Sequence, residues 1–299
     1  MASSNTSTQV NTTTLQQANA ELPTFSLHPR RPEQKPFTVT LSNRSLTVAA
    51  LGLAILSHHR TLHLARLLLV FVPLALFVHN DYQNFLRLGP GGIPSTPQGY
   101  LKASWLSIWA LKNPYEPAPA VPHYTCSPGL LRKATLPERN DPRPTTAGIA
   151  PHRQITQYGS TQCFQALTRA LQAFASMNPS EFETRVSALE KHGLALFSRK
   201  PTRQNRFQGE ICHVHDTDHS LHLFLHPDDV KVVLEQGWGE RHPMAWEWGP
   251  WKPAVGPFFV MIYAPRSENE LRIVAKIIEA AAWNMSGRTV HLSSCLPAL

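Results

Sequence analysis

The sequence contains few cysteines, with only four among its 299 residues. Cys126, Cys163, Cys212 and Cys295 are widely separated, and no two of them form a C-x-x-C pair. This scarcity excludes a cysteine-based zinc knuckle and a small disulfide scaffold. We interpret the four side chains as reduced or buried thiols, which carry no information on the cellular compartment.

Several motifs of common enzyme classes are also missing. The sequence has no glycine-rich phosphate loop, no dinucleotide-binding fingerprint, no nucleophile elbow and no H-E-x-x-H pair. Nucleotide-driven reactions and the common hydrolytic mechanisms therefore lack support. Any chemistry must come from another group of residues.

The chain is basic, with a formal net charge of +8. Arg30, Arg31, Lys35 and Arg44 lie just ahead of an apolar region, whereas a dense basic helix and the glycine-aromatic signature of RNA-binding sheets are absent. This distribution favours contact with anionic lipid and argues against a nucleic acid partner.

We predict a disordered tail over residues 1–44 and a membrane-anchor segment over residues 45–79. Residues 1–19 are nearly all Ser, Thr, Asn, Gln and Ala, and they offer too little apolar surface to offset the entropy of ordering. Two apolar blocks follow, at 46–56 and 67–78. At about 1.5 Å per helical residue, neither block alone reaches the roughly 30 Å of a hydrocarbon core.

One long helix through both apolar blocks would place Arg60 near the middle of the bilayer, at a cost of about 2.5–3.5 kcal/mol, so we set it aside. Three other arrangements of the two blocks remain open. We favour a single span over residues 61–79, with Arg66 reaching toward an interface, ahead of a shallow hairpin in one leaflet. A buried soluble helix pair is the third alternative. The first block starts too far along the chain for a cleaved signal peptide, so we expect the endoplasmic reticulum or another intracellular membrane.

Residues 80–299 are predicted to form one α+β domain, with a mainly antiparallel sheet and packed helices. A helix over 81–88 should stop at the breaker cluster of residues 89–92, and residues 238–246 should form an irregular loop. Ser267 and Glu270 form a capping box ahead of a long amphipathic helix. The other expected elements are helices at 100–111, 163–175 and 228–236, strands at 152–158 and 258–263, and mixed signals over 182–198.

The most informative stretch is a predicted β-hairpin over residues 210–225. Alternation places His213 and His215 on one face of the first strand, and Ser220 and His222 on one face of the return strand. Four histidines therefore occur within ten residues, in the pattern H-x-H-x3-H-x2-H. Such a density is more typical of a functional site than of packing alone.

Four segments of the chain resemble fungal luciferases and their non-luminous relatives. They are DYQNFLRLGP at 81–90, GEICHVHDTDHSLHL at 209–223, GWGERHP at 237–243 and YAPRSENE at 263–270. The resemblance implies a membrane-anchored enzyme that oxidises a hydroxylated pyrone, 3-hydroxyhispidin, with molecular oxygen, releasing carbon dioxide and light without an added redox cofactor. The tryptophan-rich insertion at 246–251 departs from the luminous enzymes. Of these implications we therefore retain membership of the family as the expectation, and not light emission.

These segments supply the candidate site residues for a small-molecule substrate. The candidate catalytic residues are His213, His215, Asp216, His219, His222, Arg241 and His242. The candidate substrate-binding residues are Glu210, Trp238, Tyr263 and Arg266.

Two chemistries fit the histidines, and a non-catalytic, membrane-bound small-molecule binder is a third reading. In the favoured one, no cofactor or metal is needed: His213 or His215 removes an enol proton and the anion reacts with oxygen, while Arg241 or a second histidine stabilises the charge. In the other, His213, His215, His219 and His222 hold iron or another transition metal, with Glu210 as a further potential ligand. Gly209 followed by the H-x-H pair is similar to cupin dioxygenases, although His219 stands where their acidic ligand should follow.

Overall fold

The computed structural model describes residues 31–37, 44, 47–52, 63–118, 128–133, 136–201, 206–246 and 255–297. Its helices are α3 (His63–Arg87), α4 (Pro97–Ser107), α5 (Thr161–Met177), α6 (Pro227–Glu235) and α7 (Glu268–Ser286), with short 3-10 turns η2 (Leu131–Lys133), η3 (Arg206–Gly209) and η4 (Leu292–Cys295). Its strands are β1 (Thr146–Gly148), β2 (His152–Gln154), β3 (Phe182–Val186), β4 (Leu194–Ser198), β5 (Glu210–Val214), β6 (Leu221–Phe224), β7 (Gly239–Arg241) and β8 (Phe259–Ile262).

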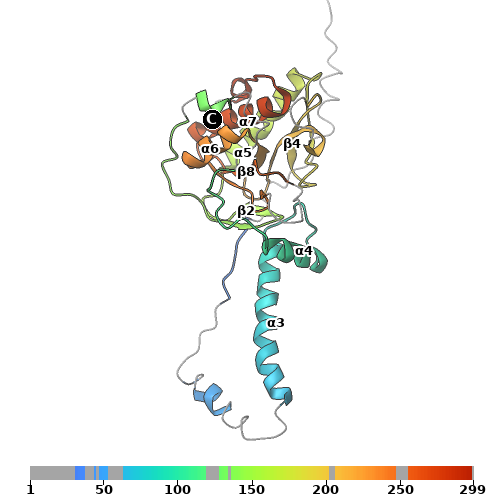
Figure 1. The fold of residues 1–299 in the computed structure, drawn as a ribbon, viewed down its shortest axis with the longest axis vertical. Helices are drawn as coiled ribbons and strands as arrows, with labels where there is room; N and C mark the ends of the chain where they lie inside the picture. The colour runs from blue at the N-terminus through green and yellow to red at the C-terminus, as the bar shows by residue number, and fades with distance from the viewer. Residues whose placement is uncertain are drawn as a thin grey trace, which may run out of the picture.

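A six-stranded antiparallel sheet forms the centre of the domain, in the order β3-β4-β5-β6-β8-β7. Helices α5 and α7 contact the sheet and help to enclose the main hydrophobic core (Figure 1). The small β1-β2 hairpin lies near the end of the domain from which α3 emerges. The predicted α+β class with an antiparallel sheet is confirmed.

Local sequence signals explain where the helices begin and end. Ser267 accepts a hydrogen bond from the Glu270 amide at the start of α7, and Gly287 ends this helix in the left-handed conformation. Ser160 caps α5 in the same way. Pro227 opens α6, where its missing amide hydrogen has no cost. These caps fix the helices whose apolar faces cover the sheet.

Two segments differ from their predicted structure. Residues 182–198, with mixed signals, form the antiparallel pair β3-β4, which turns at Gly193 with a φ of +70°. The segment 238–246, predicted as an irregular loop, contains β7, which pairs with β8 from Gly239 to Arg241. A three-residue strand between a glycine and a proline is too short for an alternation pattern to reveal.

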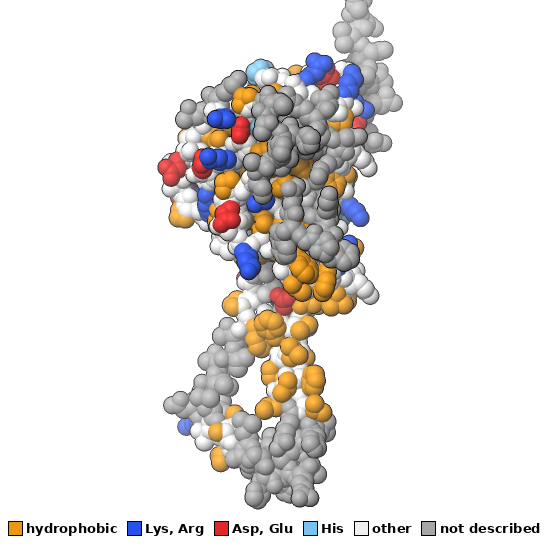
Figure 2. All heavy atoms as spheres, in the orientation of Figure 1, with side chains coloured by type: hydrophobic (Ala, Val, Ile, Leu, Met, Phe, Trp, Pro, Cys, Tyr) orange, Lys and Arg blue, Asp and Glu red, His pale blue; other side chains and the backbone are white. Residues whose placement is uncertain are grey.

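Helix α3 projects away from the domain as a rod (Figure 1). Over residues 67–78 its large apolar side chains are exposed on all sides, and Figure 2 shows them along the rod. Its last turns are fastened to the domain by Phe85, which packs in a small cluster with Ile93, Ala103 and Ile149. Apolar and polar parts thus belong to one continuous helix.

The predicted membrane-spanning helix over 61–79 is not found in that form. Among the described residues, no helix combines the length and the apolar character needed to cross a membrane. Helix α3 begins at His63 and continues through the polar stretch from Asn80 to Arg87, so its apolar run is short. Most of the predicted tail, part of the first apolar block and most of the tryptophan-rich insertion lie outside the described residues.

Candidate functional site

The register of the β5-β6 hairpin brings the histidines of the two strands together. His213 lies directly opposite His222, whereas Cys212 and Val214 face Leu223 and Leu221 on the side of the hydrophobic core. His215 follows β5 on the same face as His213. The alternation that places apolar side chains in the core therefore places three imidazoles on the other face.

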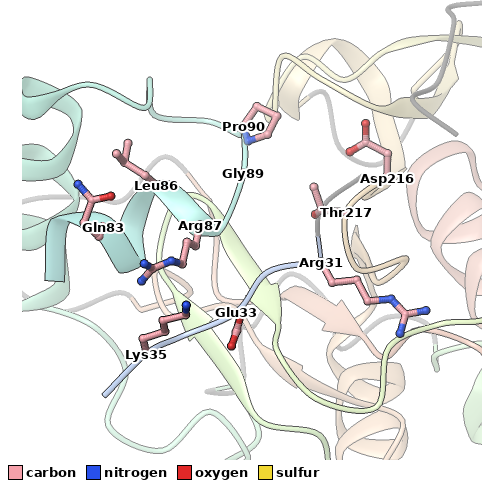
Figure 3. Close-up of a pocket in the computed structure, with 10 residues that line it drawn as sticks. All are labelled: Arg31, Glu33, Lys35, Gln83, Leu86, Arg87, Gly89, Pro90, Asp216 and Thr217. Carbon is pink, nitrogen blue, oxygen red and sulfur yellow. The ribbon is translucent and has the colours of Figure 1, made fainter. Parts of the chain in front are cut away.

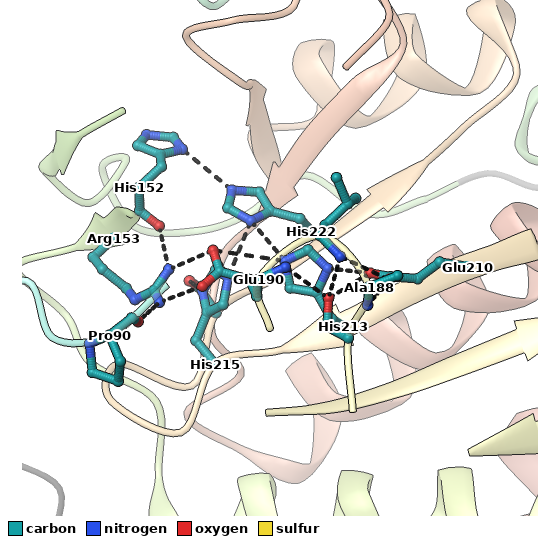
Figure 4. Close-up of polar contacts among 12 residues, drawn as sticks. Pro90, His152, Arg153, Ala188, Glu190, Glu210, His213, His215 and His222 are labelled. Atoms are coloured by element: carbon teal, nitrogen blue, oxygen red, sulfur yellow. Dashed lines mark hydrogen bonds and ion pairs between the residues drawn. The ribbon is translucent and has the colours of Figure 1, made fainter. Parts of the chain in front are cut away.

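The three imidazoles meet at the Nδ1 atom of His222. This atom lies 3.2 Å from Nε2 of His213 and 3.0 Å from Nε2 of His215. The Oε1 atom of Glu190, in the turn after β3, lies 4.0 and 3.8 Å from the same two Nε2 atoms (Figure 4). All four side chains are almost completely shielded from solvent. We call Glu190, His213, His215 and His222 the histidine cluster.

The outward nitrogen of His213 is a hydrogen-bond donor. It lies 2.6 Å from Oε1 of Glu210, which also accepts the Ser187 hydroxyl, while the other oxygen of Glu210 accepts the Ala188 amide. Because this carboxylate only accepts, Nδ1 of His213 carries the hydrogen. A neutral His213 therefore presents a bare lone pair on Nε2 to the cluster.

The same reasoning applies to His215. Ser220 donates its only hydroxyl hydrogen to Asp218 at 2.6 Å, so it must accept from Nδ1 of His215 at 2.8 Å. Neutral His215 consequently also presents a bare lone pair on Nε2. Two carboxylates on the outside of the cluster, Glu210 and Asp218, thus fix the tautomers of the two imidazoles inside it.

Glu190 is held by a buried ion pair. Arg153 of β2 donates to both of its carboxylate oxygens, at 3.1 and 2.8 Å, and also to the Pro90 carbonyl at 2.7 Å. Burial alone would raise the pKa of Glu190, but Arg153 outweighs burial and holds this pKa well below its usual range. The cluster therefore contains a fixed carboxylate.

Burial keeps His215, His222 and His242 neutral. It lowers the pKa of His215 to about 4, with Arg153 adding to the effect. Burial, followed by the neighbouring histidines, lowers the pKa of His222 and that of His242 well below the ordinary value of a histidine. At neutral pH these three imidazoles are therefore uncharged.

A second group of histidines adjoins the first through His222. Nε2 of His222 lies 3.3 Å from Nδ1 of His152, and the ring of His242 lies 5.0 Å from that of His222. His152 in turn contacts Glu240 at 3.3 Å, and Glu240 accepts the Tyr263 hydroxyl at 2.9 Å. Predicted site residues Tyr263 and His242 thus connect to the cluster, the former through Glu240 and His152.

Other predicted site residues lie elsewhere. His219 has a φ of +67°, stacks on Phe164 and bonds the Gly159 carbonyl, so its ring turns away from the cluster. Arg241 bonds the carbonyls of Pro257 and Ala245. The indole of Trp238 donates to the Pro137 carbonyl, Arg266 pairs with Asp141 and Glu270, and Asp216 lines a neighbouring cavity.

The sequence analysis did not identify Glu190, Arg153 or His152. His152 and Arg153 are neighbours in the short strand β2 and Glu190 lies in a turn, and none of them belongs to a recognisable motif. The one sequence feature that pointed to this region was the glycine cluster at 89–92. A Cβ atom on Gly91 would overlap the Glu190 carboxylate and come within 2.7 Å of the Arg153 guanidinium. The glycines therefore allow the backbone to pass directly over this ion pair.

A cavity of about 820 Å³ lies next to the cluster, at the base of α3 (Figure 3). Its walls carry three cationic side chains, Arg31, Lys35 and Arg87, and two carboxylates, Glu33 and Asp216. Thr217 lines the cavity and accepts a hydrogen bond from Arg153 at 3.1 Å. The Arg153 side chain therefore separates the cavity from Glu190.

Comparisons with known proteins agree on one family. The model of the luciferase domain matches residues 208–281. The chain is 31% identical to a luciferase of Armillaria ostoyae over 226 residues, which are 70% of this chain and 82% of the relative. A luciferase of Neonothopanus nambi is 30% identical over 225 residues, 70% of this chain and 81% of the relative. No solved structure matches. The chain belongs to the fungal luciferase family.

Proposed function

We propose that the chain is an oxygen-dependent oxidoreductase of the luciferase type, acting on a small enolisable or phenolic substrate of the hydroxypyrone kind. The observation that carries the proposal is the pair of bare, buried Nε2 atoms of His213 and His215 within a luciferase domain. Light emission is not part of the proposal.

The chemistry starts with the removal of a proton from the substrate. The Nε2 lone pair of His213 or His215 accepts the acidic enol proton, with the outer ring nitrogen held by Glu210 or Ser220. The electron-rich anion then transfers an electron to molecular oxygen in a site from which water is excluded. Molecular oxygen is the co-substrate, and no organic redox cofactor takes part.

The cavity at the base of α3 is our candidate substrate chamber. Its volume of about 820 Å³ suits a small aromatic molecule, and Arg31, Lys35 and Arg87 favour an anionic phenolate or enolate. The segment 89–92 covers Arg153 and Glu190, and its three glycines permit it to move aside. We propose that this movement admits the substrate to the imidazoles.

Oxygen uptake with a hydroxypyrone tests the proposal. His213→Ala and His215→Ala should each lower the rate about 10²- to 10⁴-fold, the usual effect of removing a general base. The matched control is His226→Asn, because His226 is equally buried but caps α6, a role that Asn also fills. Circular dichroism must show all three variants folded.

Two outcomes would contradict the proposal. Wild-type rates in both folded alanine variants would remove the histidines from the reaction. If the unmodified protein consumed no oxygen with any pyrone or phenol supplied, a non-catalytic small-molecule binder would become the better interpretation.

We further propose that α3 attaches the protein to an intracellular membrane, such as the endoplasmic reticulum. A helix that exposes apolar side chains all round is stable beside lipid but not beside water. The exposed surface continues onto α4 and its C-cap residue, where Leu101, Trp105 and Ile108 are 67%, 58% and 66% exposed. An interfacial tryptophan is typical of proteins that lie at a bilayer surface.

A further inference from the structure

The Nδ1 atom of His222 has no satisfactory hydrogen-bonding state within the cluster. It faces two Nε2 atoms, of His213 and His215, whose lone pairs are both bare in neutral rings. A neutral His222 carries at most one hydrogen on Nδ1, so at least one strong contact must be shared or lost. The carboxylate oxygen of Glu190, 3.8 and 4.0 Å from the same Nε2 atoms, adds a further acceptor to the group. Acceptors converge on one point, where a cation would satisfy all of them.

We infer that Glu190, His213, His215 and His222 bind a divalent first-row transition-metal ion. Three imidazole nitrogens and one carboxylate oxygen are a ligand set that zinc, iron and manganese commonly use. Metal bonds of about 2.0–2.1 Å place neighbouring tetrahedral ligands about 3.4 Å apart. Four of the separations between these ligand atoms, 3.0, 3.2, 3.8 and 4.0 Å, bracket this value. All four ligand atoms lie within 4.8 Å of one another.

The surroundings of the cluster are those of a metal site. Ligating histidines almost always donate their outer ring N–H to a carboxylate, a hydroxyl or a carbonyl, which fixes the tautomer. His213 does so directly to Glu210, and His215 does so through Ser220 to Asp218. Arg153 likewise holds the Glu190 carboxylate from behind. Such outer partners are unnecessary for histidines that merely fill space.

The neighbouring group of His152, His222 and His242 is a weaker candidate. Its ligand atoms also lie within 4.8 Å of one another. It has no carboxylate, and Nδ1 of His242 is occupied by the Met244 amide. It competes for the same His222 ring, whose Nε2 atom contacts His152. The first group therefore holds the ion, while His152 orients His222.

The metal site inferred here differs from the one that the sequence suggested, which was His213, His215, His219 and His222. Glu190 replaces His219, whose ring bonds Gly159 outside the cluster. The inference does not depend on the proposed substrate or on oxygen chemistry. A bound ion would occupy the Nε2 lone pairs of His213 and His215, so in the metal-bound protein these two imidazoles act as ligands and not as the base of the proposed function. An ion acquired during folding would also be resident and not an added cofactor, in keeping with the resemblance to enzymes that need none.

Metal analysis of the purified full-length chain tests the inference. We expect about one first-row transition-metal ion per chain in the unmodified protein. His222→Ala should abolish stoichiometric binding, and Glu190→Gln should weaken the binding of added zinc or iron(II) at least about tenfold. Ser220→Ala, which removes only an outer partner, should weaken binding about 10- to 100-fold. His226→Asn is the control and should retain the full metal content.

The outcomes separate the metal site from the proposed function. If the unmodified protein neither carries nor takes up a transition metal, or if folded His222→Ala keeps it, the inference is wrong. Loss of metal in His219→Ala with full retention in Glu190→Gln would restore the ligand set drawn from the sequence and also overturn it. Metal binding without oxygen uptake would support the site and reject the function. Oxygen uptake by a protein that neither carries nor takes up a transition metal would support the function and reject the site.

Discussion

Gly91 occupies a position where no side chain fits. A methyl group there would overlap the Glu190 carboxylate and come within 2.7 Å of Arg153. We predict that Gly91→Ala displaces this ion pair, lowers the free energy of unfolding by about 1–3 kcal/mol and lowers oxygen uptake at least tenfold. Denaturant unfolding and an oxygen electrode measure the two effects.

Gly237→Ala provides the control for a general loss of stability. Gly237 has a φ of +77°, and an added Cβ would meet only Arg139, at an ordinary distance of 3.6 Å. This variant should also lose about 1–2 kcal/mol, because a side chain is strained in the left-handed conformation. Its oxygen uptake should stay normal. Equal rates in the two variants would show that the backbone over Glu190 does not support the site.

The sequence was sufficient to place three of the four cluster residues. Strand alternation depends only on backbone geometry, so His213 and His215 could be assigned to one face of β5 and His222 to one face of β6. The register of the hairpin makes these the same face. Glu190 could not be assigned, because its position depends on long-range contacts: Ser187 and Ala188 bond Glu210, and Arg153 approaches from β2. His219 was a candidate site residue in the turn between the two strands, and its positive φ and its bond to the Gly159 carbonyl turn its ring away from the cluster.

Among the secondary-structure elements, those with strong local signals were predicted well. The capping box of α7 and the alternation of β5 and β6 each specify one structure within a few residues. Residues 239–241 form strand β7 because they pair with β8. Pairing of this kind is decided by tertiary contacts, which a local pattern cannot contain.

Asp229 connects α6 to the segment before η2. Its carboxylate accepts the amides of Leu130 and Leu131, at 3.1 and 2.7 Å. Burial nevertheless raises the pKa of Asp229 from 3.8 to about 6. Between pH 4 and pH 6 the folded protein therefore holds a proton that the unfolded chain has released, so this group's contribution to stability falls as the pH rises through that window.

Asp229→Asn should remove this dependence. Relative to the unmodified protein, the variant should gain up to about 3 kcal/mol in the free energy of unfolding between pH 4 and pH 7, the amount that corresponds to a pKa raised from 3.8 to about 6. Urea unfolding at several pH values measures it, with Asp228→Asn as the control. A constant difference between Asp229→Asn and the unmodified protein would refute the prediction.

For the molecule as a whole, the exposed apolar rod of α3 should decide where the protein resides. The unmodified protein should sediment with membranes and be released by detergent. Phe71→Asp combined with Leu74→Asp should shift it to the supernatant, because both side chains are more than half exposed and contribute little to folding. Met177→Asp, at an exposed apolar position of α5, is the control. A fully soluble unmodified protein would contradict the proposed attachment.

Residues 31–37 lie against the end of α3 that joins the domain. Gln34 donates to the Asn84 carbonyl at 2.9 Å, and the Asn84 side chain exchanges two hydrogen bonds with the backbone of Lys35. Residues 31–37 and the part of α3 near residue 80 therefore lie side by side at the base of the domain. If α3 enters a bilayer as proposed, both of these segments stay on the same side of it as the domain. The cavity at the base of α3, which Arg31 and Lys35 help to line, then lies on that side as well.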